Sequence, residues 1–520
     1  MPRQLRVILT LAPDSSSVSM PDSHSDTGNK ANNASLPSLP AWLDSPNESD
    51  PAESISALRD HLHVFTSAEM PLLQRAEVLD RLYMRGMSSI EKLIPDLVET
   101  PVPVPGKTRQ AIRTMQEVLY TMAEQALALH DKSNSPHQSN LRIAPDLVLW
   151  RALHALSRHL LIGSLTASPP GTGVWRKLHQ TYDLARHQGI TRNTPEGTAR
   201  SLQDEYYAAV LLGCAQPASF TAREIVFLDA YLERFSSQID SNRDKPDRTP
   251  VMFWIDPARD GPATPCSRKP PPQETPVRYF SCGRLTDLLD NQLEALDSGT
   301  DAKQLALPDF AATPAGRGVL RRLSVHWGDP GKRRFPRRRQ NYRAQLCAGL
   351  KSIFQLFQKE PVPVEASSWM IVNESPDGYA IMHVSGRTGL ITVGDVVALK
   401  TETGNNWQLC IIRWIQSENQ EHLELGLQIL SARAIAAHLA LPPGTDGNVC
   451  RPVLVLPATP VIRPEESLVV PSGMLAGHSR NLVLIIEKDN IEVREINTGQ
   501  RGEQNGQIEI YEIETEQQDH

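Results

Sequence analysis

The chain has 520 residues, with 53 Lys and Arg against 60 Asp and Glu, a length that allows about three domains and linkers. A hydrophobic fraction of 40% is enough for ordinary cores and excludes wholesale disorder. The net charge of −7 excludes a globally basic nucleic-acid coat. No 18 apolar residues follow one another to form a membrane-spanning helix. We therefore expect a cytoplasmic protein of several domains.

The N-terminal half divides into a polar segment and a helical one. Residues 1–56 are rich in Ser, Asp, Asn and Pro and predict a disordered tail. From there to residue 240, apolar residues recur at offsets of three, four and seven, which is typical of amphipathic helices. The clearest predicted helices cover residues 110–130, 147–165, 175–187, 202–212 and 222–235. This pattern indicates an all-α domain over residues 57–240.

The remainder changes character twice. Residues 241–330 form a mixed connecting region, with short strands VMFWI and VRYF and one helix over 285–296. After about residue 365 the period becomes two, and short strands separated by turn residues predict a small antiparallel β-barrel over 331–440. RAIAAHLAL, at 433–441, predicts one short helix. Residues 441–520 predict a β-rich extension with an acidic tail, either a second β module or part of the first.

Signatures of catalysis and of metal binding are missing from the sequence. It contains no GxxxxGK[ST], HExxH or GxSxG pattern. The six cysteines are scattered, without CxxC or a His at metal spacing, and are expected to be reduced thiols. We therefore predict a multidomain α+β protein that is not an enzyme and has no catalytic residues, metal or cofactor.

A dense basic segment precedes the predicted barrel. Within GKRRFPRRRQNYRA, residues 331–344, no acidic residue separates the seven basic ones, which are Lys332, Arg333, Arg334, Arg337, Arg338, Arg339 and Arg343. Six of these are Arg, which favours planar, bidentate recognition of an anion. The alternative is a solvated basic linker or an arm that grips the phosphate backbone of a nucleic acid.

A polar turn follows the first strand of the period-two region. It reads Asn373-Glu374-Ser375-Pro376-Asp377-Gly378 and lies between the strands SSWMIV and YAIMHV. Taken alone, these are ordinary turn residues.

Together the two features resemble the PilZ domain, a family of small β-barrel receptors for the bacterial messenger cyclic di-GMP. Arg338, Arg339 and Arg343 fit RRxxxR, and the turn from Asn373 to Gly378, about thirty residues later, fits [D/N]xSxxG. Three later stretches are also similar to the family, namely Leu390–Val397, Arg413-Trp414 and Leu425–Ile429. The whole resemblance covers about residues 330–440.

Two details of the resemblance are open. A second register, Arg333, Arg334 and Arg338, also fits the arginine motif, and we favour the first because Arg343 lies closer to the barrel. The segment from 343 to 367 is longer than usual in the family and is expected to hold a helical insertion.

The resemblance implies cyclic di-GMP as ligand. The implied ligand-binding residues are Arg338, Arg339, Arg343, Asn373, Ser375 and Gly378, with Arg334 and Arg333 beside them. The arginines would lie on a mobile approach to the barrel and pair with guanine O6 and N7 or with phosphate. The glycine would permit close backbone approach or a positive φ.

Our leading hypothesis is a receptor that relays the messenger level to an unidentified protein partner through its helical N-terminal region. A nucleic-acid-binding adaptor that uses the arginine-rich segment, or a scaffold that has lost its ligand, are the alternatives. The scaffold is disfavoured because both motifs are intact, and the net charge of −7 disfavours nucleic acid as a partner.

Overall fold

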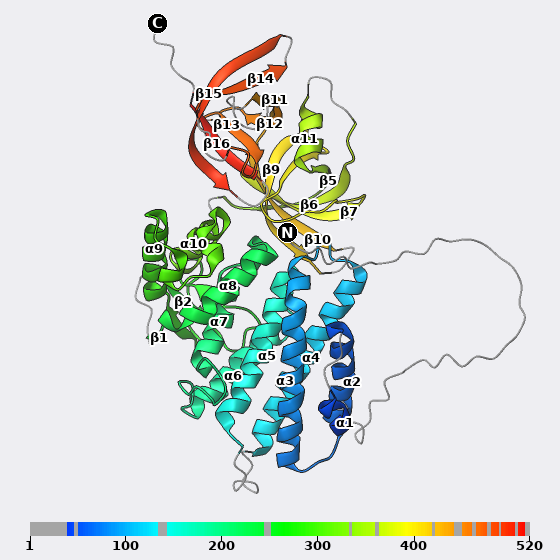
Figure 1. Ribbon diagram of the computed structural model, residues 1–520, viewed down its shortest axis with the longest axis vertical. Helices are drawn as coiled ribbons and strands as arrows, with labels where there is room; N and C mark the ends of the chain where they lie inside the picture. Colours follow the sequence, from blue (N-terminus) through cyan, green and yellow to red (C-terminus); the bar gives the residue numbers. More distant parts are fainter. Residues whose placement is uncertain are drawn as a thin grey trace, which may run out of the picture.

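The computed structural model combines helices with three β-sheets (Figure 1). It describes residues 39–45, 50–133, 143–243, 251–331, 335–358, 363–418, 422–440, 450–459, 464–475, 480–487, 490–504 and 508–514. A helical region comes first and two closed barrels follow, which confirms the predicted α+β class. In the described ranges, none of the helices combines the length and apolar character needed to cross a membrane.

The helical region confirms the periodicity seen in the sequence. Its helices are α1 (Leu39–Asp44), α2 (Pro51–Ser67), α3 (Leu72–Val98), α4 (Gly106–Ser133), α5 (Pro145–Leu165), α6 (Val174–His187), α7 (Leu202–Cys214), α8 (Ala222–Phe235), α9 (Gly283–Asp297) and α10 (Pro314–Trp327). Caps define several starts: Asp50 accepts from the N–H of Ala52 before α2, and Thr221 and Glu224 form a capping box on α8.

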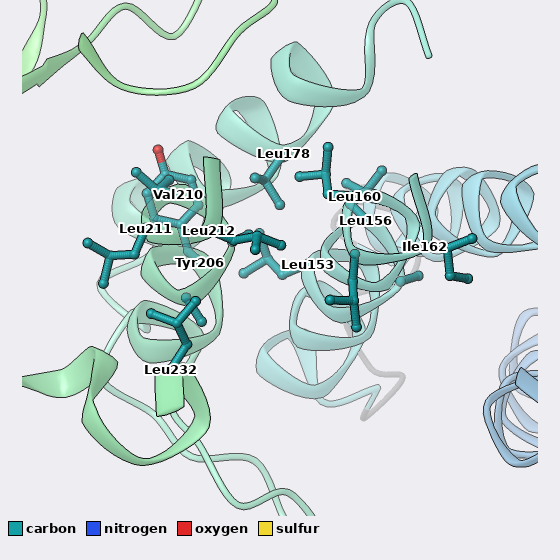
Figure 2. Close-up of a cluster of buried hydrophobic side chains, with 14 of the residues drawn as sticks. Leu153, Leu156, Leu160, Ile162, Leu178, Tyr206, Val210, Leu211, Leu212 and Leu232 are labelled. Carbon is teal, nitrogen blue, oxygen red and sulfur yellow. The ribbon is translucent and has the colours of Figure 1, made fainter. Parts of the chain in front are cut away.

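Leucine-rich faces hold these helices together. Figure 2 shows Leu153, Leu156 and Leu160 of α5 near Leu178 of α6 and the apolar face of α7. Leu153, Leu156 and Leu178 are fully buried. Burying each such side chain contributes about 1.5–3 kcal/mol, so packing rather than helix propensity stabilises the region.

The helical region begins earlier than predicted. Helix α1 and the first residues of α2 (51–56) occupy positions that the sequence assigned to a disordered tail over 1–56, and residues 1–38 lie outside the described ranges. Leu39 is buried, and the guanidinium carbon of Arg85 lies 3.9 Å from the ring centroid of Trp42. Arg85 belongs to α3, and Leu39 packs into the core of the helical region, so composition alone did not reveal these contacts.

The mixed region is not a separate unit. Its sheet has the order β1-β4-β2-β3, with β1 (Asp240–Arg243), β2 (Met252–Ile255), β3 (Thr264–Pro265) and β4 (Arg278–Ser281). Phe280 of β4 and Trp327 of α10 belong to the same hydrophobic core as the helices, and the Trp327 indole donates to the carbonyl oxygen of Leu211 at 3.1 Å. The boundary predicted at 240/241 therefore divides one packed region.

The first barrel closes in the order β10-β7-β6-β5-β8-β9. Its strands are β5 (Arg338–Ala348), β6 (Ser367–Ser375), β7 (Gly378–Ser385), β8 (Val396–Thr401), β9 (Gln408–Ser417) and β10 (Leu423–Ser431). The period-two pattern arises because alternate side chains such as Trp369 and Ile371 fill the interior. The predicted helical insertion is α11 (Leu350–Phe357). Its Ile353 and Phe354 pack in a core shared by the two barrels.

Residues after the first barrel build a second closed barrel in the order β11-β12-β13-β16-β15-β14. Its strands are β11 (Ile435–Ala440), β12 (Arg451–Leu456), β13 (Ser467–Pro471), β14 (Leu482–Glu487), β15 (Ile491–Gln504) and β16 (Ile508–Glu514). The short helix predicted over 433–441 is wrong for the described part of that range, since residues 435–440 pair with β12 and β14 as β11. A segment this short forms no stable helix alone, and the two neighbouring strands decide its conformation. The division predicted at 440/441 moves to the turn between β10 and β11.

The helical region and the first barrel make direct contact. Arg109 of α4 donates to the carbonyl oxygen of Ser417 at 3.2 Å and to its Oγ at 2.9 Å. The N–H of Ser417, at the end of β9, donates to the carbonyl oxygen of Ala167 at 2.7 Å. Val102 forms a β-bridge with Ile391. The barrel thus rests on the ends of several helices (Figure 1).

Candidate functional site

The arginine motif lies on a strand. Arg338, Arg339 and Arg343 belong to β5 itself, which corrects the expected mobile approach to the barrel. Ala344 and Leu346 of the same strand are buried, whereas the three arginines are exposed. Among the described residues, no hydrogen bond or ion pair engages their guanidinium groups. The guanidinium groups of all three arginines are therefore accessible to solvent on strand β5.

Strand register brings the two motifs together. Antiparallel pairing places Arg338 opposite Glu374 and Arg339 opposite Asn373, which puts the Cα atoms of each pair about 5 Å apart. A bulge between Arg339 and Tyr342 interrupts the ladder, and Arg343 pairs further along, opposite Met370. An extra residue at a bulge re-aims the side chains that flank it. The site is thus formed by β5, β6 and the turn after β6.

The turn between β6 and β7 is held by its own polar groups. Ser375 Oγ donates to Asp377 Oδ1 at 2.6 Å and to the carbonyl oxygen of Gly378 at 3.2 Å. The carbonyl oxygen of Asp377 accepts from the N–H of Ile429 in β10, at 2.9 Å. These bonds fix the turn against the barrel wall before any ligand arrives.

Gly378 has a packing role. A Cβ atom at this position would overlap the carbonyl oxygen of Leu427 in β10, the strand that pairs with β7. The backbone φ of Gly378 is not positive. The predicted positive φ is therefore wrong, the close backbone approach at Gly378 is to β10, and a role of this glycine in ligand binding stays a prediction.

Three polar side chains near the arginines were missed by the sequence reasoning. Glu374 Oε2 accepts from Tyr342 Oη at 3.1 Å and from Gln340 Nε2 at 3.2 Å. Burial and the Glu374 carboxylate raise the pKa of Tyr342 above its ordinary value, so this phenol stays protonated. All three residues stood inside or beside the motifs, and only the strand register shows that they meet.

A second carboxylate lies on the other side of β5. Glu402 Oε2 accepts from the backbone N–H of Arg343 at 3.1 Å, and its own N–H donates to the Arg343 carbonyl oxygen at 2.9 Å. These bonds tie the turn after β8 to the last arginine of the motif.

Two predicted residues, Arg333 and Arg334, lie outside the described residues, so their contribution stays a prediction.

In the part of the chain that the structure describes, no cluster of three or more His, Cys, Asp or Glu could hold a metal ion.

A small antiparallel barrel with arginines on one strand and an Asn-x-Ser-x-x-Gly turn on its neighbour is the arrangement of a PilZ domain. Comparison with family models agrees: residues 358–435 match the middle PilZ domain of the cyclic-di-GMP receptor FimW, and residues 37–244 match the N-terminal domain of that receptor. Residues 358–435 therefore belong to the PilZ family, which confirms the resemblance seen in the sequence. The arginine motif lies just before the matched residues.

One curated relative is the cyclic-di-GMP receptor FimW of Pseudomonas aeruginosa, which is 21% identical over 405 residues. The match covers 62% of this chain and 65% of the relative, slightly less than two thirds of its length. No solved structure matches the chain significantly.

Proposed function

We propose that this chain is a cytoplasmic, non-enzymatic receptor for cyclic di-GMP and that its first barrel binds the messenger. The observation that supports the proposal is the pairing of Arg339 with Asn373, which brings the two motifs next to each other on adjacent strands. The name of the Pseudomonas relative supports the same ligand. A reducing compartment agrees with the cysteines, all six of which are free thiols.

The chemistry of the site suits this ligand. Cyclic di-GMP has two phosphates and two guanines, whose O6 and N7 atoms accept bidentate hydrogen bonds from Arg. Arg338, Arg339 and Arg343 are exposed, and their guanidinium groups have no partners among the described residues. Binding therefore breaks no existing ion pair, and each charge-assisted bond contributes about 1.5–3 kcal/mol. Asn373 adds an amide that can both donate and accept.

The second part of the proposal is a relay to a protein partner through the helical region. Arg109 is buried and binds the end of β9, so a shift of that strand moves the end of α4. A cavity of about 540 Å³ lies at this junction, lined by side chains of both units, and leaves room for such a shift. Ligand binding can bias two arrangements of the junction only if the ligand prefers one of them.

Calorimetric titration of the full chain with cyclic di-GMP tests the proposal, with cyclic di-AMP as the comparison. We expect saturable binding of cyclic di-GMP and much weaker binding of cyclic di-AMP, because adenine lacks the O6 acceptor. Equal affinity for the two would refute guanine recognition. The nucleic-acid alternative predicts instead binding to duplex DNA that weakens steeply with salt.

A further inference from the structure

Glu374 is a carboxylate in a site built for an anion. It lies opposite Arg338 in the β5–β6 ladder and next to Asn373 in the chain. Within the described residues it forms no ion pair with any arginine, and its bonds come from the neutral donors Tyr342 and Gln340. A negative charge that the arginines do not neutralise weakens their attraction for phosphate. A direct contact between Glu374 and the ligand would compensate for this loss of attraction.

The geometry of Glu374 leaves one oxygen free for such a contact. Both donors bind Oε2, and no hydrogen bond is formed by Oε1 in the described part of the chain. The side chain is half-buried, so Oε1 is held in place by the Tyr342 and Gln340 contacts and still reaches solvent. Holding a recognition group in place before the ligand binds reduces the entropy lost on binding.

Guanine has donors that match this acceptor. Its Watson–Crick edge carries N1–H and N2–H₂, and an ionised carboxylate is an acceptor only. Adenine has an unprotonated N1 on the same edge, which repels a carboxylate. Asn373 has a single amide oxygen and cannot accept from both guanine donors in the geometry of a carboxylate.

We propose that Glu374 is a specificity-determining residue that accepts hydrogen bonds from the Watson–Crick edge of one guanine of the ligand and disfavours adenine. This inference rests on the proposed function. It separates two tasks within the site: the arginines attract the phosphates and the acceptor atoms of the bases, whereas Glu374 recognises the guanine donors and rejects a base that lacks them.

The test combines a change in the protein with a change in the ligand. Glu374→Gln keeps an oxygen that accepts from Tyr342 and Gln340 but removes the charge. Glu402→Gln is the matched control, because it removes an equal charge beside Arg343 on the other side of β5. Cyclic di-inosine monophosphate is the second ligand, since it keeps O6, N7 and N1–H but lacks the N2 amino group.

For the wild-type chain we expect cyclic di-inosine monophosphate to bind about tenfold more weakly than cyclic di-GMP. Glu374→Gln should weaken cyclic di-GMP binding about tenfold and reduce the difference between the two ligands to less than about threefold. Glu402→Gln should leave the full difference in place. Thermal unfolding of each variant confirms that the barrel is intact.

Three outcomes would overturn the inference and leave the proposed function in place. Tighter binding of both ligands by Glu374→Gln would show that the carboxylate only repels phosphate, and equal effects of the two variants would show a general charge effect. An unchanged difference between the ligands in Glu374→Gln would show that another residue contacts the amino group. A wild-type chain that does not bind cyclic di-GMP at all would instead refute the proposed function and this inference with it.

Discussion

Replacing Arg339 or Arg343 by Ala gives the most direct measurement of the site. Both side chains are exposed, and neither has a guanidinium partner among the described residues, so their removal leaves no buried group unpaired. Exposed substitutions of this kind change folding free energy by less than about 0.5 kcal/mol. Any loss of binding therefore reports contacts with the ligand.

The expected loss follows from the bonds that each guanidinium can form. A charge-assisted hydrogen bond contributes about 1.5–3 kcal/mol, which corresponds to an increase in Kd of about 12-fold to about 140-fold. We expect Arg339→Ala to lie toward the upper end, since Arg339 pairs directly with Asn373. Ser375→Ala should have a smaller effect, because its hydroxyl already donates within the turn.

Calorimetry of the full chain with cyclic di-GMP measures these changes, and Arg451→Ala is the matched control. Arg451 is also an exposed arginine on a strand, but it belongs to β12 of the second barrel. If Arg339→Ala and Arg343→Ala bind as well as Arg451→Ala, the arginine motif is not the binding site. If Arg333→Ala is far more damaging than Arg343→Ala, the other register of the motif is correct.

Three further predictions concern the surrounding structure. Gly378→Ala should destabilise the first barrel by about 3 kcal/mol, because a methyl group would overlap the Leu427 carbonyl; unchanged thermal unfolding would contradict this. Arg109→Ala should leave the Kd for cyclic di-GMP nearly unchanged but abolish any ligand-dependent change in hydrogen exchange of α4, and an intact change would exclude this route. Burial lowers the pKa of His154 to about 3 and of His179 to about 4. The unfolded chain therefore binds more protons than the folded chain below pH 6.5, so the stability of the helical region should fall between about pH 6.5 and pH 4. A thermal unfolding temperature of the helical region that stays constant over that range would refute the reasoning.

Sequence periodicity was sufficient to predict the elements in which the spacing of apolar residues itself shows which side chains are buried. The leucines of α5 recur at helical spacing, and the first residues of β6 alternate between buried and partly exposed positions, so each pattern identified its element before any neighbour was known. It failed at α1 and β11, which are short and take their conformation from partners distant in the chain. Leu39 is buried by packing of the helical region, and Ile435 pairs with Val455.

For the candidate site, too, the sequence determined some features and the tertiary structure determined others. By itself the sequence determined the residue types and the order of the two motifs, because the planar, bidentate bonding of arginine is a property of the side chain and does not depend on the fold. Only the tertiary structure decided that Arg338 faces Glu374 and that Tyr342 donates to it, since strand register depends on the whole barrel. Arg109 and Ser417 are 308 residues apart, and no local pattern could pair them. Contacts of this kind arise when complete domains pack, so their partners are chosen by shape and by the need to satisfy buried polar groups rather than by spacing along the chain.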